Sequence, residues 1–167
     1  MKEYDCTLWS LLKLDTTCPV PISTRLNLLK TIVETVIFIQ SKNFCHLDLK
    51  PGNIFLNKNP NGTWNGHDLV VADFGLSTAF NELKGQAGTP GFGAPEQFLG
   101  KPSRKSDNFA MGKMAVLILF KWQTGWNLLA SPLTPTTPDY INHLPQVRRI
   151  ISELLNVSIN NFHVETP

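Results

Sequence analysis

Residues 44–56 read FCHLDLKPGNIFL and residues 71–77 read VADFGLS, and these two stretches carry most of the chemistry of the sequence. The first places Asp48 and Asn53 in a tight turn ahead of an apolar strand, and the second places Asp73 at the end of the next strand. Strands joined by a hairpin lie side by side, so we expect these three side chains to converge on one point. Converging polar groups repel or desolvate one another unless a ligand lies between them, which predicts a binding site.

The residue types in these stretches are those that phosphoryl transfer requires. A carboxylate orients the attacking hydroxyl and accepts its proton, and a lysine offsets charge on the transferred group. Oxygen ligands hold one or two Mg²⁺ ions. Lys50, two residues after Asp48, supplies the positive charge in the same turn.

Apolar residues at helical spacing predict helices around this hairpin. They are a short stripe at 8–12, a long helix after Pro21 that stops near Asn43, an apolar helix from Ser106, its cap, to about Trp122, and a last helix over 147–155. The long helix has Ser23 or Thr24 as its expected cap, and its expected buried face consists of Leu26, Leu29, Val33 and Val36 or Ile37. Strands are expected at 54–56 and 69–71, joined by a polar hairpin at 60–66. The pattern predicts a mainly α fold with a small β-hairpin region.

The composition of the 167 residues fits one soluble globular domain, with 42% hydrophobic and 17% charged residues. The net charge is +2 and the basic residues are scattered, which argues against nucleic-acid binding. Neither a signal peptide nor a membrane-spanning segment is expected, so the predicted location is the cytoplasm or nucleus. The three cysteines, Cys6, Cys18 and Cys45, are interpreted as reduced thiols, and Cys45 as a small buried hydrophobe. The Pro/Thr-rich stretch at 131–145 is interpreted as a surface loop.

Together with GTPGFGAPE (88–96), the two stretches resemble the signature of the protein kinase superfamily. HLDLKPGN (46–53) is similar to the catalytic loop, DFG (73–75) to the metal-binding turn, and 88–96 to the end of the activation segment. Residues 3–12 are similar to the segment after the kinase hinge and residues 105–120 to the central buried helix. Lys50 and Thr89 favour the serine/threonine class.

The resemblance implies a role for each matching residue. Asp48 and Lys50 would be catalytic, Asn53 and Asp73 would hold Mg²⁺, and Phe55 would lie under the adenine of ATP. Structural support would come from His46, Thr89, Glu96 and Asp107, with Asp107 tying down the catalytic-loop backbone. His46 is expected to pack and not to bind a metal.

The resemblance also implies that residues 1–167 form a single domain, the C-terminal lobe of a kinase, truncated at both ends relative to a complete kinase domain. The Gly-rich loop and the ATP-anchoring lysine of the N-terminal lobe are not found in it. The chain alone is therefore expected to bind Mg²⁺-ATP weakly or not at all and to phosphorylate nothing at a useful rate. Its partner would be a protein substrate, with an N-terminal lobe supplied elsewhere. The alternative is an inactive kinase mimic, or pseudokinase, that binds and inhibits another kinase.

Three further expectations follow from the resemblance. Leu47 stands where most kinases have an arginine that pairs with an activation-loop phosphate, so regulation by phosphorylation at Ser77 or Thr78 is not expected. Phe162 stands where an arginine usually meets the glutamate at position 96, so Glu96 needs another partner or water. Phe55 and Phe74 would be left uncovered, so a docking surface for a separate N-terminal lobe, or self-association, is expected there.

Overall fold

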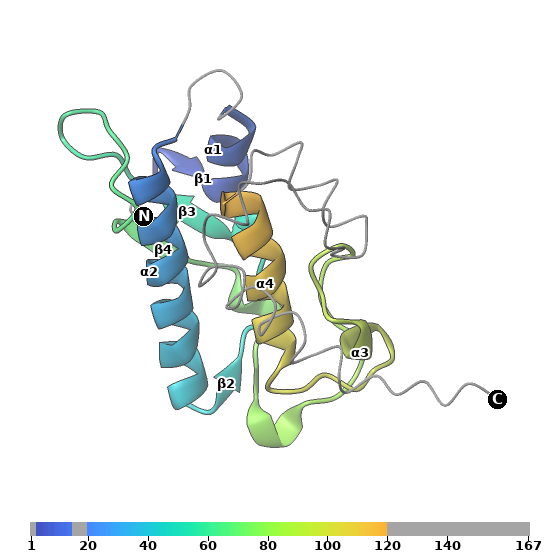
Figure 1. Cartoon of the computed structure of the whole chain (residues 1–167). Coiled ribbons are helices and arrows are strands. Elements are labelled where there is room, and N and C mark those ends of the chain that lie inside the picture. The colour runs from blue at the N-terminus through green and yellow to red at the C-terminus, as the bar shows by residue number, and fades with distance from the viewer. Residues whose placement is uncertain (1–2, 15–19, 120–167) are drawn as a thin grey trace.

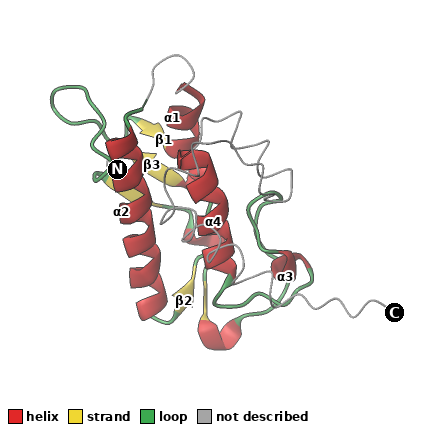
Figure 2. Ribbon diagram, viewed as in Figure 1, coloured by secondary structure: helices red, strands yellow, loops and turns green. Residues whose placement is uncertain are grey.

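The computed structural model describes residues 3–14 and 20–119, in which helices pack around two small antiparallel sheets (Figures 1 and 2). The helices are α1 (Leu8–Leu14), α2 (Ile22–Ser41), α3 (Pro95–Phe98) and α4 (Ser106–Leu119). The strands are β1 (Cys6–Thr7), β2 (Phe44–Cys45), β3 (Ile54–Leu56), β4 (Leu69–Val71) and β5 (Thr78–Ala79). Short 3-10 turns lie at Pro51–Asn53, Phe74–Leu76 and Phe80–Glu82. Helices with a small β region match the expected mixture. Four expectations lie outside the described residues: the helix over 147–155, the helix end near Trp122, the loop at 131–145 and the role of Phe162.

The β3–β4 hairpin has the bounds that the sequence predicts. The two strands are antiparallel, with Phe55 opposite Val70, and β1 pairs with the other edge of β3. β2 and β5 form a separate pair. Just beyond the hairpin strands, Ala72 N donates a hydrogen bond to Asn53 O at 2.9 Å. The hairpin therefore brings the start of β3 and the end of β4 together, as expected.

The loop between β3 and β4 is bound to the side of α2. Thr24, Asn27 and Thr31 donate side-chain hydrogen bonds of 3.0–3.2 Å to three successive carbonyls of this loop, those of residues 64–66. Gly66 has a φ of 79°, and a Cβ on it would lie 2.6 Å from Thr24 O, so only glycine fits there. These contacts fix the position of the hairpin on the helix.

The core lies between α2 and α4, which run side by side in Figure 1. The buried residues of α2 include Leu28, Leu29, Ile32, Val36 and Ile39. The expected face was wrong in part: Leu26 is 39% exposed and Val33 is only partly buried. Of the two alternatives at the end of that face, Val36 is buried and Ile37 is 58% exposed. α2 carries apolar residues on nearly every side, so their spacing does not indicate which side meets α4.

The expected cap of α2 was also wrong. Pro21 precedes the first turn of α2 and no side chain caps it, because the Thr24 hydroxyl donates to the loop carbonyl of Trp64 instead. Ser106, the expected cap of α4, is the first residue of that helix, and its hydroxyl accepts from Ser103 N at 3.0 Å and donates to Glu96 Oε1 at 2.8 Å. α2 ends as expected near Asn43, whose φ of 63° turns the chain out of the helix. In the part of the chain that the structure describes, no helix is long and apolar enough to cross a bilayer.

Candidate active site

The loop after β2 is held by one buried carboxylate on α4. Asp107 is 1% exposed and accepts hydrogen bonds from His46 N at Oδ2 and from Leu47 N at Oδ1, both at 2.8 Å. Burial raises the pKa of the Asp107 carboxyl above its usual value, while the two N–H groups act in the opposite direction. Asp107 thus holds the backbone directly before Asp48, which is the contact that its expected supporting role requires.

His46 is fully buried and joins this loop to the end of β4. Its Nδ1 accepts a hydrogen bond from Asp48 N at 3.3 Å, and its Nε2 lies 3.0 Å from Ala72 O. Since Nδ1 accepts, the ring proton belongs on Nε2, which donates it to Ala72 O. Ala72 also donates its N–H to Asn53 O, so the residue directly before Asp73 is tied to both segments.

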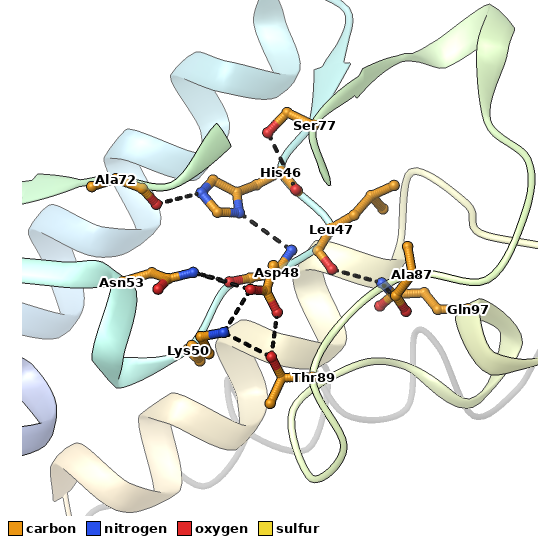
Figure 3. A network of polar contacts seen from close by, with 10 residues as sticks. All are labelled: His46, Leu47, Asp48, Lys50, Asn53, Ala72, Ser77, Ala87, Thr89 and Gln97. Carbon is orange, nitrogen blue, oxygen red and sulfur yellow. Dashed lines mark hydrogen bonds and ion pairs between the residues drawn. The ribbon is translucent and has the colours of Figure 1, made fainter. Parts of the chain in front are cut away.

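Asp48 lies at the centre of a polar cluster (Figure 3). Lys50 Nζ lies 2.7 Å from Asp48 Oδ2, and the Thr89 hydroxyl donates to Asp48 Oδ1 at 2.6 Å. Lys50 also donates to the Thr89 hydroxyl at 2.8 Å. The Nδ2 of Asn53 donates to Asp48 O at 2.9 Å and to Oδ2 at 3.2 Å. The structure thus brings Asp48, Lys50, Asn53 and Thr89 together from two segments that are far apart in the sequence.

These contacts decide the charge state of Asp48, which is 8% exposed. Burial by itself would raise the pKa of the carboxyl, but the hydrogen bonds and charge of Lys50, with the hydrogen bonds of Thr89 and Asn53, outweigh it and lower the pKa. Asp48 is therefore a carboxylate, an acceptor of hydrogen bonds, at neutral pH.

Asp73 lies beside this cluster but no hydrogen bond among the described residues joins it to Asp48 or Asn53. It is exposed and has left-handed backbone angles, with φ 63° and ψ 68°. A non-glycine residue in this conformation costs about 1–3 kcal/mol, and such residues gather at functional sites. Of the three side chains expected to converge, Asp48 and Asn53 are hydrogen-bonded to each other. Asp73 lies nearby, and no described hydrogen bond joins it to either of them.

The oxygen atoms at this place fit Mg²⁺. The Nδ2 of Asn53 is used by Asp48, and no described residue donates to its Oδ1, while Asp73 adds an exposed carboxylate. Within residues 3–14 and 20–119, no group of three or more His, Cys, Asp or Glu could hold a metal ion by itself. Mg²⁺ is ordinarily held by one or two protein oxygens together with substrate phosphates, so two such ligands are sufficient.

Gln97 is a residue of this region that no sequence pattern indicated. It is 1% exposed, and its Nε2 donates to Leu47 O at 2.8 Å and to Ala87 O at 3.4 Å. A Cβ on Gly88, whose φ is 97°, would lie 2.8 Å from this nitrogen. Gly88 and Gln97 are nine residues apart in the sequence and meet only in the fold, so the sequence held no signal for Gln97.

Glu96 is buried and has found hydrogen-bond donors. Its Oε1 accepts from the hydroxyls of Ser106 at 2.8 Å and of Ser103 at 3.4 Å. No described residue donates to its Oε2, which is buried. Two serine hydroxyls thus supply the other partner that was expected for Glu96.

The two aromatic residues expected at the nucleotide side differ in exposure. Phe55 is partly buried, and its ring centroid lies 5.8 Å from that of Tyr4. Phe74 is 50% exposed, and its other side contacts the His46 ring at a centroid distance of 4.8 Å. Phe74 therefore presents an apolar surface beside Asp73.

Cys45 is fully buried directly before His46, as expected for a small hydrophobe. Its Sγ donates a long hydrogen bond, 3.8 Å, to Ser103 O. Burial, followed by the charge of Asp107, raises the pKa of the Cys45 thiol to about 12, although Arg104 opposes the shift. The thiol is therefore protonated at neutral pH and is a poor nucleophile.

Substitution of Ser77 by aspartate is not expected to order the segment around residue 77. The Ser77 hydroxyl donates to His46 O at 3.2 Å, and a carboxylate cannot replace this donor. Leu47 is 3% exposed and offers no positive charge to a negative group at position 77. We expect Ser77→Asp to lower the melting temperature by about the same small amount as Ser77→Ala, on the order of one net hydrogen bond. A rise of several degrees for Ser77→Asp alone would show that another cation receives the charge.

The comparisons with known proteins agree with this geometry. The model of the protein kinase domain family matches residues 4–132. Calcium/calmodulin-dependent protein kinase type II of Caenorhabditis elegans is 27% identical over 143 residues, which cover 78% of this chain and 19% of that protein. Serine/threonine-protein kinase pkn2 of Myxococcus xanthus is 28% identical over 159 residues, 81% of this chain and 19% of that protein. Calcium-dependent protein kinase 3 of Plasmodium yoelii yoelii is 32% identical over 97 residues, which cover 55% of this chain and 17% of that protein. The chain thus spans less than a fifth of the length of these three relatives.

Proposed function

Because this chain belongs to the protein kinase family, we propose that it provides the phosphoryl-transfer lobe of a serine/threonine protein kinase. The reaction would move the γ-phosphoryl group of ATP to a serine or threonine hydroxyl of a protein substrate. The observation that carries this proposal is the Asp48 carboxylate, held at once by Lys50, Thr89 and Asn53. Such a cluster has a positioned base and an ammonium group side by side.

Each residue of the cluster has a defined task in this proposal. Asp48 orients the substrate hydroxyl and accepts its proton; a carboxylate has about four lone-pair sites, so it can accept this bond in addition to those already made. The side chain of Lys50 is 26% exposed, so its ammonium can approach the transferred group. Asn53 and Asp73 would hold Mg²⁺, which when bound neutralises charge on the phosphates.

We propose further that residues 1–167 act as a single C-terminal lobe and that an N-terminal lobe completes the nucleotide site. The exposed ring of Phe74 and the partly buried ring of Phe55 support this, since both offer apolar surface to a covering element. Phe55 would then lie under the adenine ring. Self-association through the same rings stays a second possibility for this surface.

The second candidate function is that of an inactive mimic, which binds another kinase and inhibits it. The exposed Phe74 favours this function as much as the first one. Leu47, which cannot take part in phosphate-dependent activation, also fits a lobe that is not activated in the usual way. The intact cluster around Asp48 favours catalysis, because an inhibitor that works by docking does not require it.

The test measures transfer of labelled γ-phosphate from Mg²⁺-ATP to a library of serine and threonine peptides. Residues 1–167 are assayed alone and mixed with a separately produced N-terminal kinase lobe. We expect transfer in the mixture and none by either part alone. An inactive mixture, with inhibition of the intact kinase that supplied the lobe, would establish the mimic instead. If there is no transfer and no inhibition, both functions are contradicted.

Millimolar Mn²⁺ is expected to raise the melting temperature of the wild type by about 3–6 °C, the shift for a ligand at roughly ten times its dissociation constant. Asp73→Asn should abolish the shift, because it removes a charged oxygen ligand. Glu82→Gln, which neutralises an exposed carboxylate outside the cluster, should retain it. Equal shifts for wild type and Asp73→Asn would exclude Asp73 as a metal ligand. The measurement is a thermal scan with and without the ion.

A further inference from the structure

Leu47 occupies a backbone conformation that leucine rarely adopts. Its φ is 64°, in the left-handed region, where the side chain crowds the carbonyl. Both of its peptide groups are held: the N–H donates to Asp107 Oδ1, and the carbonyl accepts from Gln97 Nε2, each at 2.8 Å. A strained turn persists only when its surroundings over-determine it. One of the two restraints on Leu47 is therefore supplied by Gln97.

The amide of Gln97 uses both of its ends inside the protein. Its Oε1 accepts from Ala94 N at 2.8 Å, and its Nε2 donates to Leu47 O and, more weakly, to Ala87 O. The side chain is 1% exposed, so water does not compete for these bonds. In Figure 3 Gln97 and Leu47 face each other between the two segments. Gln97 thus ties residues 87–94 to the loop that contains Asp48.

These bonds lie next to both partners of the shortest contact in the cluster. Asp48 directly follows Leu47, and Thr89 follows Gly88, whose α-carbon lies so close to Gln97 that a side chain there would collide with it. The 2.6 Å hydrogen bond from Thr89 to Asp48 therefore joins two pieces of backbone that Gln97 already holds together.

We propose that Gln97 is a positioning residue that keeps Asp48 and Thr89 in register, and that it does so without phosphorylation. This rests on the function proposed above for Asp48. With leucine at position 47, the loop itself has no arginine there that could pair with a phosphate on the 77–89 segment. The Gln97 amide supplies a permanent link between the same two segments, so the site is assembled whenever the lobe is folded.

A glutamine is required because the position needs donors and an acceptor at once. Gln97→Glu keeps the shape and the oxygen that accepts from Ala94 N, but it places a second oxygen against two carbonyl oxygens. When that carboxyl is protonated, it can again donate one bond to Leu47 O, and burial shifts such a protonation toward higher pH. Gln97→Met keeps a similar length and forms no such bond at any pH.

The test follows amide hydrogen exchange in the full chain at pH 7 and pH 5, always relative to the wild type at the same pH. At pH 7 we expect Gln97→Glu and Gln97→Met to speed exchange at Leu47 and Asp48 by roughly 10- to 100-fold, the range for a lost buried hydrogen bond. Amides in the middle of α2, at Ile32 and Val36, should stay unchanged. At pH 5 the effect of Gln97→Glu should shrink, and that of Gln97→Met should not.

The matched control is Gln40→Glu, since Gln40 Nε2, on α2, also donates to a backbone carbonyl, that of Arg104, at 3.2 Å. Its other described side-chain hydrogen bond goes to Asn108 Oδ1, so it does not bind Leu47 or Asp48. It should leave Leu47 and Asp48 unchanged at both pH values. Equal acceleration at Leu47, Asp48 and α2 would mean that Gln97 only stabilises the fold, and this would overturn the proposal. No acceleration, or no acid rescue, would overturn it too. If Gln97→Glu does not fold at pH 7, the uncharged Gln97→Met decides. These measurements need no transfer activity, so their failure is distinct from a failure of the proposed function.

Discussion

Asp107→Ala is expected to lower the free energy of unfolding by about 2–6 kcal/mol, because it leaves two buried backbone donors unsatisfied at about 1–3 kcal/mol each. The donors are the N–H groups of His46 and Leu47, and both residues are at most 3% exposed. The Leu47 turn would keep only its bond to Gln97. Urea unfolding, with the slope compared between variants, measures the change.

Two variants separate this effect from the loss of any carboxylate. Asp107→Asn keeps one acceptor oxygen and should cost less than alanine. Asp5→Ala removes a carboxylate that also accepts a backbone N–H, that of Lys58 at 2.7 Å, but at an exposed place. It should cost below about 1 kcal/mol, since water can replace the lost acceptor. A cost for Asp107→Ala no larger than that for Asp5→Ala would show that the loop finds other acceptors.

Asp48→Asn is expected to reduce phosphoryl transfer by about 10²–10⁴-fold in the mixture with an N-terminal lobe, the usual worth of a positioned general base. The amide cannot accept the proton of the substrate hydroxyl. Its nitrogen would also face Lys50 Nζ or the Thr89 hydroxyl, which now donate to a carboxylate. Initial rates at saturating ATP measure the change. A variant that retains more than a tenth of the rate would contradict a base role for Asp48.

The pH dependence of stability shows whether the neighbours of Asp48 stabilise its carboxylate in the folded state. The folded state lowers the pKa of Asp48, so this group stabilises the protein above its usual pKa of about 4. That contribution is lost as the pH falls through the lowered pKa. Asp48→Asn lacks the titrating group, so the gap in stability between it and the wild type should narrow in acid. A gap that is constant with pH would mean that Asp48 gains nothing from its neighbours.

The hairpin could be predicted from the sequence because its signal is local. Short apolar runs at 54–56 and 69–71 with a polar turn between them gave both strands with their observed bounds. The buried face of α2 could not be predicted in the same way. Ile37 and Phe38 are 58% and 61% exposed although they are as apolar as the residues that face α4, so only packing decides between the sides.

In the candidate site, too, the local contacts could be predicted from the sequence and the long-range contacts could not. Asp48, Lys50 and Asn53 lie within six residues of one another, and their proximity follows from the turn itself. The role of Gln97 depends on its contacts with Leu47 and Ala87, which are 50 and 10 residues away in the sequence, respectively. No sequence pattern around a glutamine predicts such contacts. Glu96 was expected to need a partner, but the two serine hydroxyls that meet it became visible only in the fold.

The buried thiol of Cys45 gives the protein an internal chemical reporter. A thiol with a pKa of about 12 and no exposed surface reacts with iodoacetamide only after the segment around it has opened. Cys6, on β1, has a raised pKa but is partly exposed, so its alkylation would not wait for the same event. Cys45 directly precedes His46, and its alkylation rate, followed by mass spectrometry of the tryptic peptide, would therefore count how often the loop that carries Asp48 opens in an otherwise native molecule.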